Sequence, residues 1–242
     1  MPDIGAQVGA SVNALTKELD IIAHNLANAS TAGYKRRCNA FTKALQEQTG
    51  TQGDMIVQDP SQMSLDLSQG NMVQTDRTLD FALYGKGFFV IETPNGPLYT
   101  RHGVFQSNVN GQIVDLSGRV VAGMAGPITL PANVDPLGIS VSSDGRISAN
   151  GAAIGQFRVV EFPDRENQLV PVGDTCFQAP REVMPVDATG PTVKQGYQEG
   201  SNVKVVDELV NLITVSRLYE ANMRTASVAR DMSNSMISVA MG

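Results

Sequence analysis

The residues best able to do chemistry are few in this sequence and stand far apart. The chain has 242 residues, with two histidines (His24 and His102) and two cysteines (Cys38 and Cys176). Two widely separated cysteines form neither a disulfide framework nor the closely spaced ligand pairs of a zinc site. So little histidine also leaves scant material for the commonest acid–base catalysis. We therefore predict no metal site, no cofactor and two unpaired thiols.

Three short motifs resemble functional loops, but each lacks a part that its chemistry needs. The Gly-Lys-Gly tripeptide at 85–87 lacks the GxxxxGK[ST] frame of a phosphate-binding loop. The Asp-Gly dipeptide at 144–145 lacks the alternating acidic ligands of a calcium loop. Ser201 and Ser216 have no G-x-S-x-G context for a nucleophile. The sequence therefore provides no catalytic residue, and we predict that the protein is not an enzyme.

Composition limits the partners of the chain. Charged residues make up 17% of the sequence and the net charge is −6, whereas nucleic-acid binding needs clustered Lys and Arg to neutralise phosphates. No apolar run approaches the roughly 20 residues of a membrane span. The N-terminal segment lacks the basic region and the unbroken apolar core of a cleaved signal peptide. We expect no nucleic acid, no membrane insertion, and either a cytosolic location or export without a cleaved leader.

Helical patterns occupy both ends of the chain. Apolar residues three or four apart predict one helix over 3–27 and a second over 203–240. In the first helix these positions are Ile4, Val8, Val12, Leu15, Leu19, Ile22 and Leu26. In the second the series begins at Leu212, Val215 and Tyr219 and continues through small and polar residues. Since the spacing is close to a heptad repeat, we predict that the two helices pack as a coiled-coil domain.

Neither helix can bury its own apolar stripe, because an isolated helix is marginal in water without a tertiary partner. The partner is either the other helix, in a hairpin that closes a monomer, or helices of neighbouring subunits. On the second interpretation the helices drive assembly. The residues that we predict to carry it are Leu15, Leu19, Ile22, Leu26, Leu209, Leu212, Val215 and Tyr219.

The middle of the chain has a β pattern. Short β-rich runs such as FFVIE (88–92) alternate with Asn-Gly and Asp-Gly dipeptides at 95–96, 110–111, 144–145 and 150–151, which are typical hairpin turns. An antiparallel β domain is predicted, and the fold class is α+β. The predicted domains are an N-terminal helix (1–30), an extended connector (31–71), the β domain (72–190), and a C-terminal linker and helix (191–242).

Three stretches resemble the axial proteins of the bacterial flagellum, the family of rod, hook and hook-associated proteins. They are AHNLANASTAGYKR (23–36), LDFALYGKGFFVIETPNGPLYTRHGVF (79–105) and QGYQEGSNVKVVDELVNLITVSRLYEAN (195–222). In the first, the matching residues are Asn25, Leu26, Ala27, Asn28, Thr31, Gly33, Tyr34 and Lys35. In the third they include Gly200, Ser201, Asn202, Asn211, Arg217 and Glu220. Among these, Asn25, Asn28, Gly33, Asn202 and Asn211 are expected to fix bends and polar contacts.

The resemblance implies a structural subunit of the basal-body rod, the periplasmic drive shaft that surrounds the export channel and transmits torque. Its terminal helices would polymerise with copies of itself and with other proximal, distal and hook-side proteins. Export would go through the flagellar type III apparatus. The run GRVVAGMAGPITLP (118–131) and the short chain favour the proximal (FlgF) type over the distal (FlgG) type. His24, Lys86 and Ser216 depart from the usual family pattern.

One alternative belongs to another class of function. In it the protein is a secreted binding module or enzyme whose β domain carries the activity, while the helices only close the core. That interpretation requires a concave site with convergent polar groups between residues 72 and 185.

Overall fold

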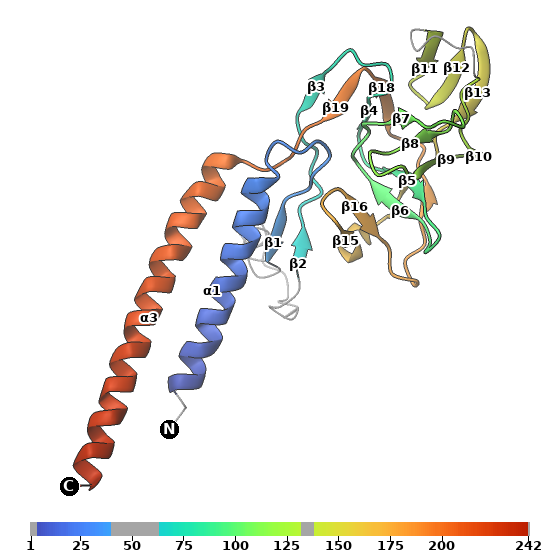
Figure 1. Cartoon of the computed structure of the whole chain (residues 1–242). Helices are drawn as coiled ribbons and strands as arrows, with labels where there is room; N and C mark the ends of the chain where they lie inside the picture. The colour runs from blue at the N-terminus through green and yellow to red at the C-terminus, as the bar shows by residue number, and fades with distance from the viewer. Residues whose placement is uncertain (1–3, 40–62, 132–137, 242) are drawn as a thin grey trace. The chain divides into compact units, whose positions relative to one another are not determined.

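The computed structural model describes residues 4–39, 63–131 and 138–241, and the chain divides into two compact units (Figure 1). We call Met1–Ala27, Arg37–Ser64 and Val203–Gly242 the helical unit. Asn28–Arg36 and Leu65–Asn202 form the β unit. Most of the predicted connector, residues 40–62, lies outside the described residues, so that expectation stays a prediction.

The helical unit contains two helices that run antiparallel, α1 (Ile4–Ala27) and α3 (Val205–Met241) (Figure 1). Two polar contacts define their register. Asn222 donates from Nδ2 to Ser11 Oγ at 3.3 Å, and Asn25 donates from Nδ2 to Glu208 Oε2 at 3.4 Å. The two predicted helices are therefore present. A two-stranded ladder of β1 (Arg37–Asn39) and β2 (Met63–Leu65) follows α1 in the sequence.

The predicted coiled coil is wrong. A coiled coil buries the apolar a and d positions of both helices. Among the helical side chains that the structure describes, Ile22 is the one apolar residue that is buried. The apolar residues of α3 are instead spread around its circumference. The exposed ones are Val205, Val206, Leu209, Val210, Ile213, Leu218, Met223 and Val228. The heptad-like spacing thus identified two helices but not a buried seam between them.

The β unit is antiparallel throughout. Its strands are β3 (Met72–Gln74), β4 (Phe81–Tyr84), β5 (Phe88–Glu92), β6 (Leu98–Thr100), β7 (Gln106–Ser107), β8 (Ile113–Val114), β9 (Val120–Gly123), β10 (Gly126–Pro127), β11 (Ile139–Val141), β12 (Arg146–Ala149), β13 (Ala152–Gln156), β14 (Val159–Glu161), β15 (Val170–Val172), β16 (Cys176–Gln178), β17 (Val186–Asp187), β18 (Thr192–Gln195) and β19 (Tyr197–Glu199). A short 3₁₀ turn, η2 (Glu166–Gln168), precedes β15.

A ten-stranded sheet forms the body of this unit, in the order β15-β16-β6-β5-β9-β8-β7, with β10, β14 and β17 paired beside this path. Three smaller ladders complete it: β11-β12-β13, β4-β18 and β3-β19. The predicted turn dipeptides lie where these strands reverse. At 150–151, Asn150 and Gly151 have φ of 49° and 83° and join β12 to β13, as a primed two-residue turn requires.

Apolar side chains cover both faces of the main sheet. Along β5, Phe89 and Ile91 belong to one buried cluster, while Phe88 and Val90 belong to another. Successive side chains of a strand point to opposite faces, so this alternation places β5 between two cores. Aromatic pairs fill both, with Phe89 and Phe105 5.4 Å apart between ring centroids and Phe88 and Phe177 5.8 Å apart. This rigid core is the support for the polar site described next.

Candidate functional site

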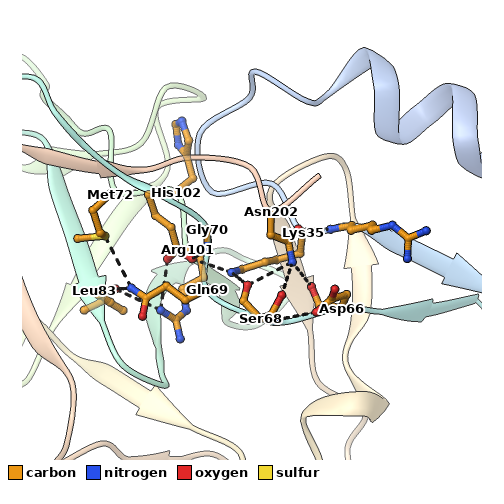
Figure 2. Close-up of polar contacts among 12 residues, drawn as sticks. Lys35, Asp66, Ser68, Gln69, Gly70, Met72, Leu83, Arg101, His102 and Asn202 are labelled. Carbon is orange, nitrogen blue, oxygen red and sulfur yellow. Dashed lines mark hydrogen bonds and ion pairs between the residues drawn. The ribbon is translucent and has the colours of Figure 1, made fainter. Parts of the chain in front are cut away.

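A buried ionic cluster joins three sequence-distant parts of the β unit (Figure 2). At its centre, the carboxylate of Glu199 lies between two cations. Lys35 Nζ donates to Oε1 at 2.7 Å, and Arg101 Nη1 donates to Oε2 at 3.3 Å. The backbone N–H of Gly70 also donates to Oε1, at 2.9 Å. We call Lys35, Arg101, Glu199 and the neighbouring Asn202 the clasp.

Both cations also donate to backbone carbonyls. Lys35 Nζ donates to the carbonyl oxygen of Ser68 at 2.6 Å. Arg101 Nη2 donates to the carbonyl oxygen of Gly85 at 2.7 Å, and its guanidinium carbon lies 5.4 Å from the ring centroid of Phe88. Buried charges persist only when they are paired and hydrogen-bonded. The clasp meets that requirement except at Arg101 Nε, which is buried without a hydrogen-bond partner among the described residues.

Asn202 connects the segment after α1 to the segment before β3 (Figure 2). Its Oδ1 accepts the backbone N–H of Arg36 at 2.7 Å. Its Nδ2 donates to the carbonyl oxygens of Asp66 and Ser68, at 2.8 and 3.2 Å. One amide thus bridges two backbone segments, which the N–H of Asp66 also links by donating to the carbonyl of Arg36 at 2.9 Å.

Gly33 allows the segment after α1 to approach the β strands closely. Its φ is +68°, a left-handed conformation that favours glycine, and an added Cβ would collide with the backbone of His102. Its N–H donates to the carbonyl of Glu199 at 2.7 Å, and the next residue, Tyr34, is fully buried. The glycine, tyrosine and lysine of the family motif therefore act as one docked turn.

Burial dominates the electrostatics of the clasp. The side chains of Lys35 and Glu199 are 1% and 0% exposed. Burial lowers the pKa of the Lys35 ammonium, while attraction to Glu199 acts in the opposite direction. Burial likewise lowers the pKa of the Arg101 guanidinium. A lysine with a lowered pKa can be a nucleophile, but this one has no access to solvent or substrate. The geometry is suited to holding segments together rather than to catalysis.

Asn25 makes a second polar contact set, in the helical unit. It is fully buried, and its side chain mimics a ladder: Oδ1 accepts the N–H of Arg37 at 2.9 Å and Nδ2 donates to the carbonyl of Arg37 at 2.8 Å. After α1 ends at Ala27, the N–H of Thr31 donates to the carbonyl of Asn28 at 3.1 Å and begins a turn. Polar side chains near the helix end thus direct the chain into its return path.

The predicted assembly residues lie on α1 and α3, in the helical unit. Leu15, Leu19 and Leu26 on α1 are half-buried, as are Leu212, Val215 and Tyr219 on α3. Ile22 is buried, whereas Leu209 is 45% exposed. The family-motif residues Asn211, Arg217 and Glu220 are also exposed on α3, while Gly200 and Ser201 are half-buried beside the clasp. The structure thus locates these residues, and their role in assembly stays a prediction.

A shallow cleft in the β unit is the strongest candidate for the alternative, ligand-binding interpretation. Its polar lining includes Thr31, His102, Asp115, Arg119 and Cys176. Three of these groups bond to one another: Arg119 donates from Nε to Asp115 Oδ2 at 2.7 Å and from Nη2 to Cys176 Sγ at 3.1 Å. In the described ranges, no three or more His, Cys, Asp or Glu residues gather as a metal site.

Sequence reasoning missed the ion pairing of the clasp. Lys35 and Arg101 were noted only as parts of matching motifs, and Glu199 stood unremarked inside the third stretch. A signal was present, because each of the three stretches contributes one charged member. That signal could not be recognised without knowing which charges are buried.

Comparison with known proteins gives the clasp its context. The chain matches three protein-family models: "Flagella basal body rod protein" over residues 9–35, "Flagellar hook protein FlgE/F/G D1 domain" over 82–149, and "Flagellar basal body rod FlgEFG protein C-terminal" over 194–239. The flagellar basal-body rod protein FlgG of Agrobacterium fabrum is 33% identical over 95% of this chain and 96% of its own length. The chain belongs to the flagellar basal-body rod protein family.

Other rod proteins of both types are similar to it. FlgF of Caulobacter vibrioides is 30% identical over 92% of this chain and 91% of its own length. FlgF of Escherichia coli is 31% identical over 93% of this chain and 92% of its own length. Family membership makes this a structural protein of the FlgF/FlgG kind and not an enzyme.

Two further findings concern this rod-family chain. Lys35, Arg101 and Glu199 each lie in a different one of the three matched regions, so the clasp is where the family's segments meet.

Within the described parts of the chain, neither helix is both long enough and apolar enough to cross a membrane.

Proposed function

We propose that the protein is a structural subunit of the bacterial flagellar rod that assembles through its terminal helices with copies of itself and with other rod proteins. The observation that carries the proposal is the exposed apolar surface of α3. Val206, Val210 and Ile213 are 72%, 57% and 55% exposed in the single chain. Burying one such side chain contributes roughly 1.5–3 kcal/mol, so a helix of this kind is stabilised by neighbouring subunits.

The β unit has a different part in this proposal. Its clasp ties together the segment that follows α1 and the segment that precedes α3, and a fully buried ion cluster resists slippage between them. A subunit that transmits torque needs such a link between its assembling helices and its folded body. The clasp supports a mechanical role and needs no ligand.

We further propose the proximal rod type, in the periplasm, with export through the flagellar type III apparatus. The stretch at 118–131 supports the proximal type, and relatives named FlgF and FlgG are both similar to the chain. The distal type is the competing outcome of the test below. Neighbouring subunits would contact one another heterologously, as in any open helical assembly.

The test is complementation of strains that lack either the proximal or the distal rod protein, scored by swimming and by rods in isolated basal bodies. We expect the wild-type chain to restore the proximal-type strain. Val210→Asp should abolish rescue, because it places a charge on the assembling helix while leaving the β unit intact. Val109→Asp makes the same change at a fully exposed position of the β unit and should still rescue.

Rescue of the distal-type strain alone would show that the protein is of the distal type. Full rescue by Val210→Asp would contradict assembly through α3. The ligand-binding alternative would replace ours if a chain without either helix retained a specific ligand.

A further inference from the structure

The residues that precede α3 pair with two strands in the β unit and bond to the segments beside them. Residues 192–202, which we call the strap, supply β18 to β4 and β19 to β3, and neither β3 nor β4 has another strand partner among the described residues. The N–H of Gly196 donates to the carbonyl of Asp80 at 2.8 Å, and that of Gly200 donates to the carbonyl of Asn71 at 2.7 Å. The strap therefore pairs with other segments of the β unit from β18 to Gly200.

The turn that follows α1 depends on the same strap. Between Asn28 and Arg36, which we call the N-terminal turn, three groups are bound by it: the N–H of Gly33, the Lys35 ammonium and the N–H of Arg36. Their acceptors are the carbonyl of Glu199, the carboxylate of Glu199 and the Oδ1 of Asn202. Without the strap, Lys35 would be buried beside Arg101 with no carboxylate bound to either.

We propose that the strap is a closing element, so that the N-terminal turn docks on the β unit only when residues 192–202 are in place. Two buried cations without their anion are strongly unfavourable, so the turn cannot dock stably first. The main sheet is not subject to this order, because β5, β6, β8 and β9 pair with one another independently of the strap.

Closure has a consequence for the whole chain. The N-terminal turn begins directly after α1 ends at Ala27, and α3 begins at Val205, soon after the strap ends. A single folding step therefore fixes, within the β unit, both segments that connect in sequence to the terminal helices. This inference concerns the β unit alone and does not depend on the proposed role in the rod.

The first test is pulse-labelled hydrogen exchange during refolding of the full-length wild-type protein. Four amides report on closure. Those of Gly33 and Arg36 donate from the N-terminal turn to the strap, and those of Gly196 and Gly200 donate from the strap to the carbonyls of Asp80 and Asn71. The amides of Ile113 and Arg158 report on the main sheet, where they donate to the carbonyls of Ile128 and Ala122. We expect the sheet amides to gain protection first and the four closure amides to gain it together.

The second test compares native-state exchange in Glu199→Gln with that in Glu182→Gln, which neutralises an exposed carboxylate of the same unit. Glu199→Gln should lower the protection of all four closure amides by at least about 100-fold and leave Ile113 and Arg158 protected. Glu182→Gln should change none of them.

Two results would overturn the proposal. One is protection of Gly33 and Arg36 before Gly196 and Gly200 during refolding. The other is a folded Glu199→Gln protein in which the strap amides lose protection while the N-terminal turn keeps it. If Glu199→Gln does not fold, the order of protection in the wild-type protein decides alone. Loss of rod assembly in any variant has no bearing on this order.

Discussion

The β unit and the helical unit of this protein handle burial in opposite ways. In the β unit, central strands such as β5 are covered on both faces, and even the charges of Lys35, Arg101 and Glu199 are buried and paired. In the helical unit, α3 leaves Val206, Val210 and other apolar side chains exposed to solvent. The first unit thus builds two apolar cores of its own, whereas Ile22 is the one apolar side chain buried among the described helical residues.

The largest expected difference lies between apolar truncations in the two units. Ile91→Ala removes a fully buried side chain of the main sheet and should lower the free energy of unfolding of the β unit by about 2–5 kcal/mol. Ile213→Ala, on exposed α3, should change the stability of the isolated chain by no more than about 0.5 kcal/mol. Urea denaturation of both variants measures this, and equal losses would erase the distinction between the units.

A smaller effect is expected within the clasp. Lys35→Met keeps the length of the side chain but removes a charge-assisted bond to Glu199, so unfolding of the β unit should become easier by about 1.5–3 kcal/mol. Lys204→Met removes an exposed charge and is the matched control, with a change near zero. The comparison would lose its basis if both variants unfolded at the same urea concentration.

The helical unit also buries polar groups, among them Asn25 and Glu208, and removal of Asn25 sharpens the comparison. Asn25→Ala deletes two hydrogen bonds to the backbone of Arg37 and should destabilise the end of α1 by about 1–2 kcal/mol. Asn13→Ala, on an exposed turn of the same helix, should have little effect. Hydrogen exchange at the last turn of α1 distinguishes them. Unchanged protection in Asn25→Ala would mean that apolar contacts, and not these hydrogen bonds, stabilise the end of α1.

The smallest effect concerns pH. Burial lowers the pKa of His102, while the nearby Asp115 and Asp80 act to raise it. Because the folded-state pKa lies below the unfolded value of about 6.5, the unfolded chain takes up this proton first. Stability should therefore fall as the pH drops below about 6.5, through the folded pKa. His102→Gln should flatten that fall between about pH 7.5 and about pH 5 in urea titrations, and an unaltered slope would exclude His102 as its source.

Local patterns revealed the elements but not how completely they are packed. The spacing of Ile4 through Leu26 predicted a helix over 3–27, and α1 runs from Ile4 to Ala27. The Asn-Gly dipeptides predicted antiparallel hairpins because their backbone conformation is local. The coiled coil failed because spacing by three and four specifies a helix face, whereas burial of that face depends on what lies opposite it. Opposite α1, the described face of α3 offers Ser216, Asn222 and Ala226 beside its half-buried apolar residues.

Local sequence patterns could not predict the clasp, for a different reason. Lys35 and Glu199 are separated by 164 positions, and single charges have no periodic signal. Each appears in the sequence as an ordinary surface residue next to polar neighbours. Only long-range contacts, such as those from the N–H of Gly33 to the carbonyl of Glu199 and from the N–H of Arg36 to Asn202 Oδ1, bring their segments together.

By itself, then, the sequence determined the helical ends, the turns of the β middle and the family, because each depends on short-range spacing or on motifs read in order. Only the tertiary structure decided which charges are buried, which polar groups satisfy one another and which apolar surfaces stay exposed. These are properties of contacts between distant segments, and their free energy depends on burial in the folded chain.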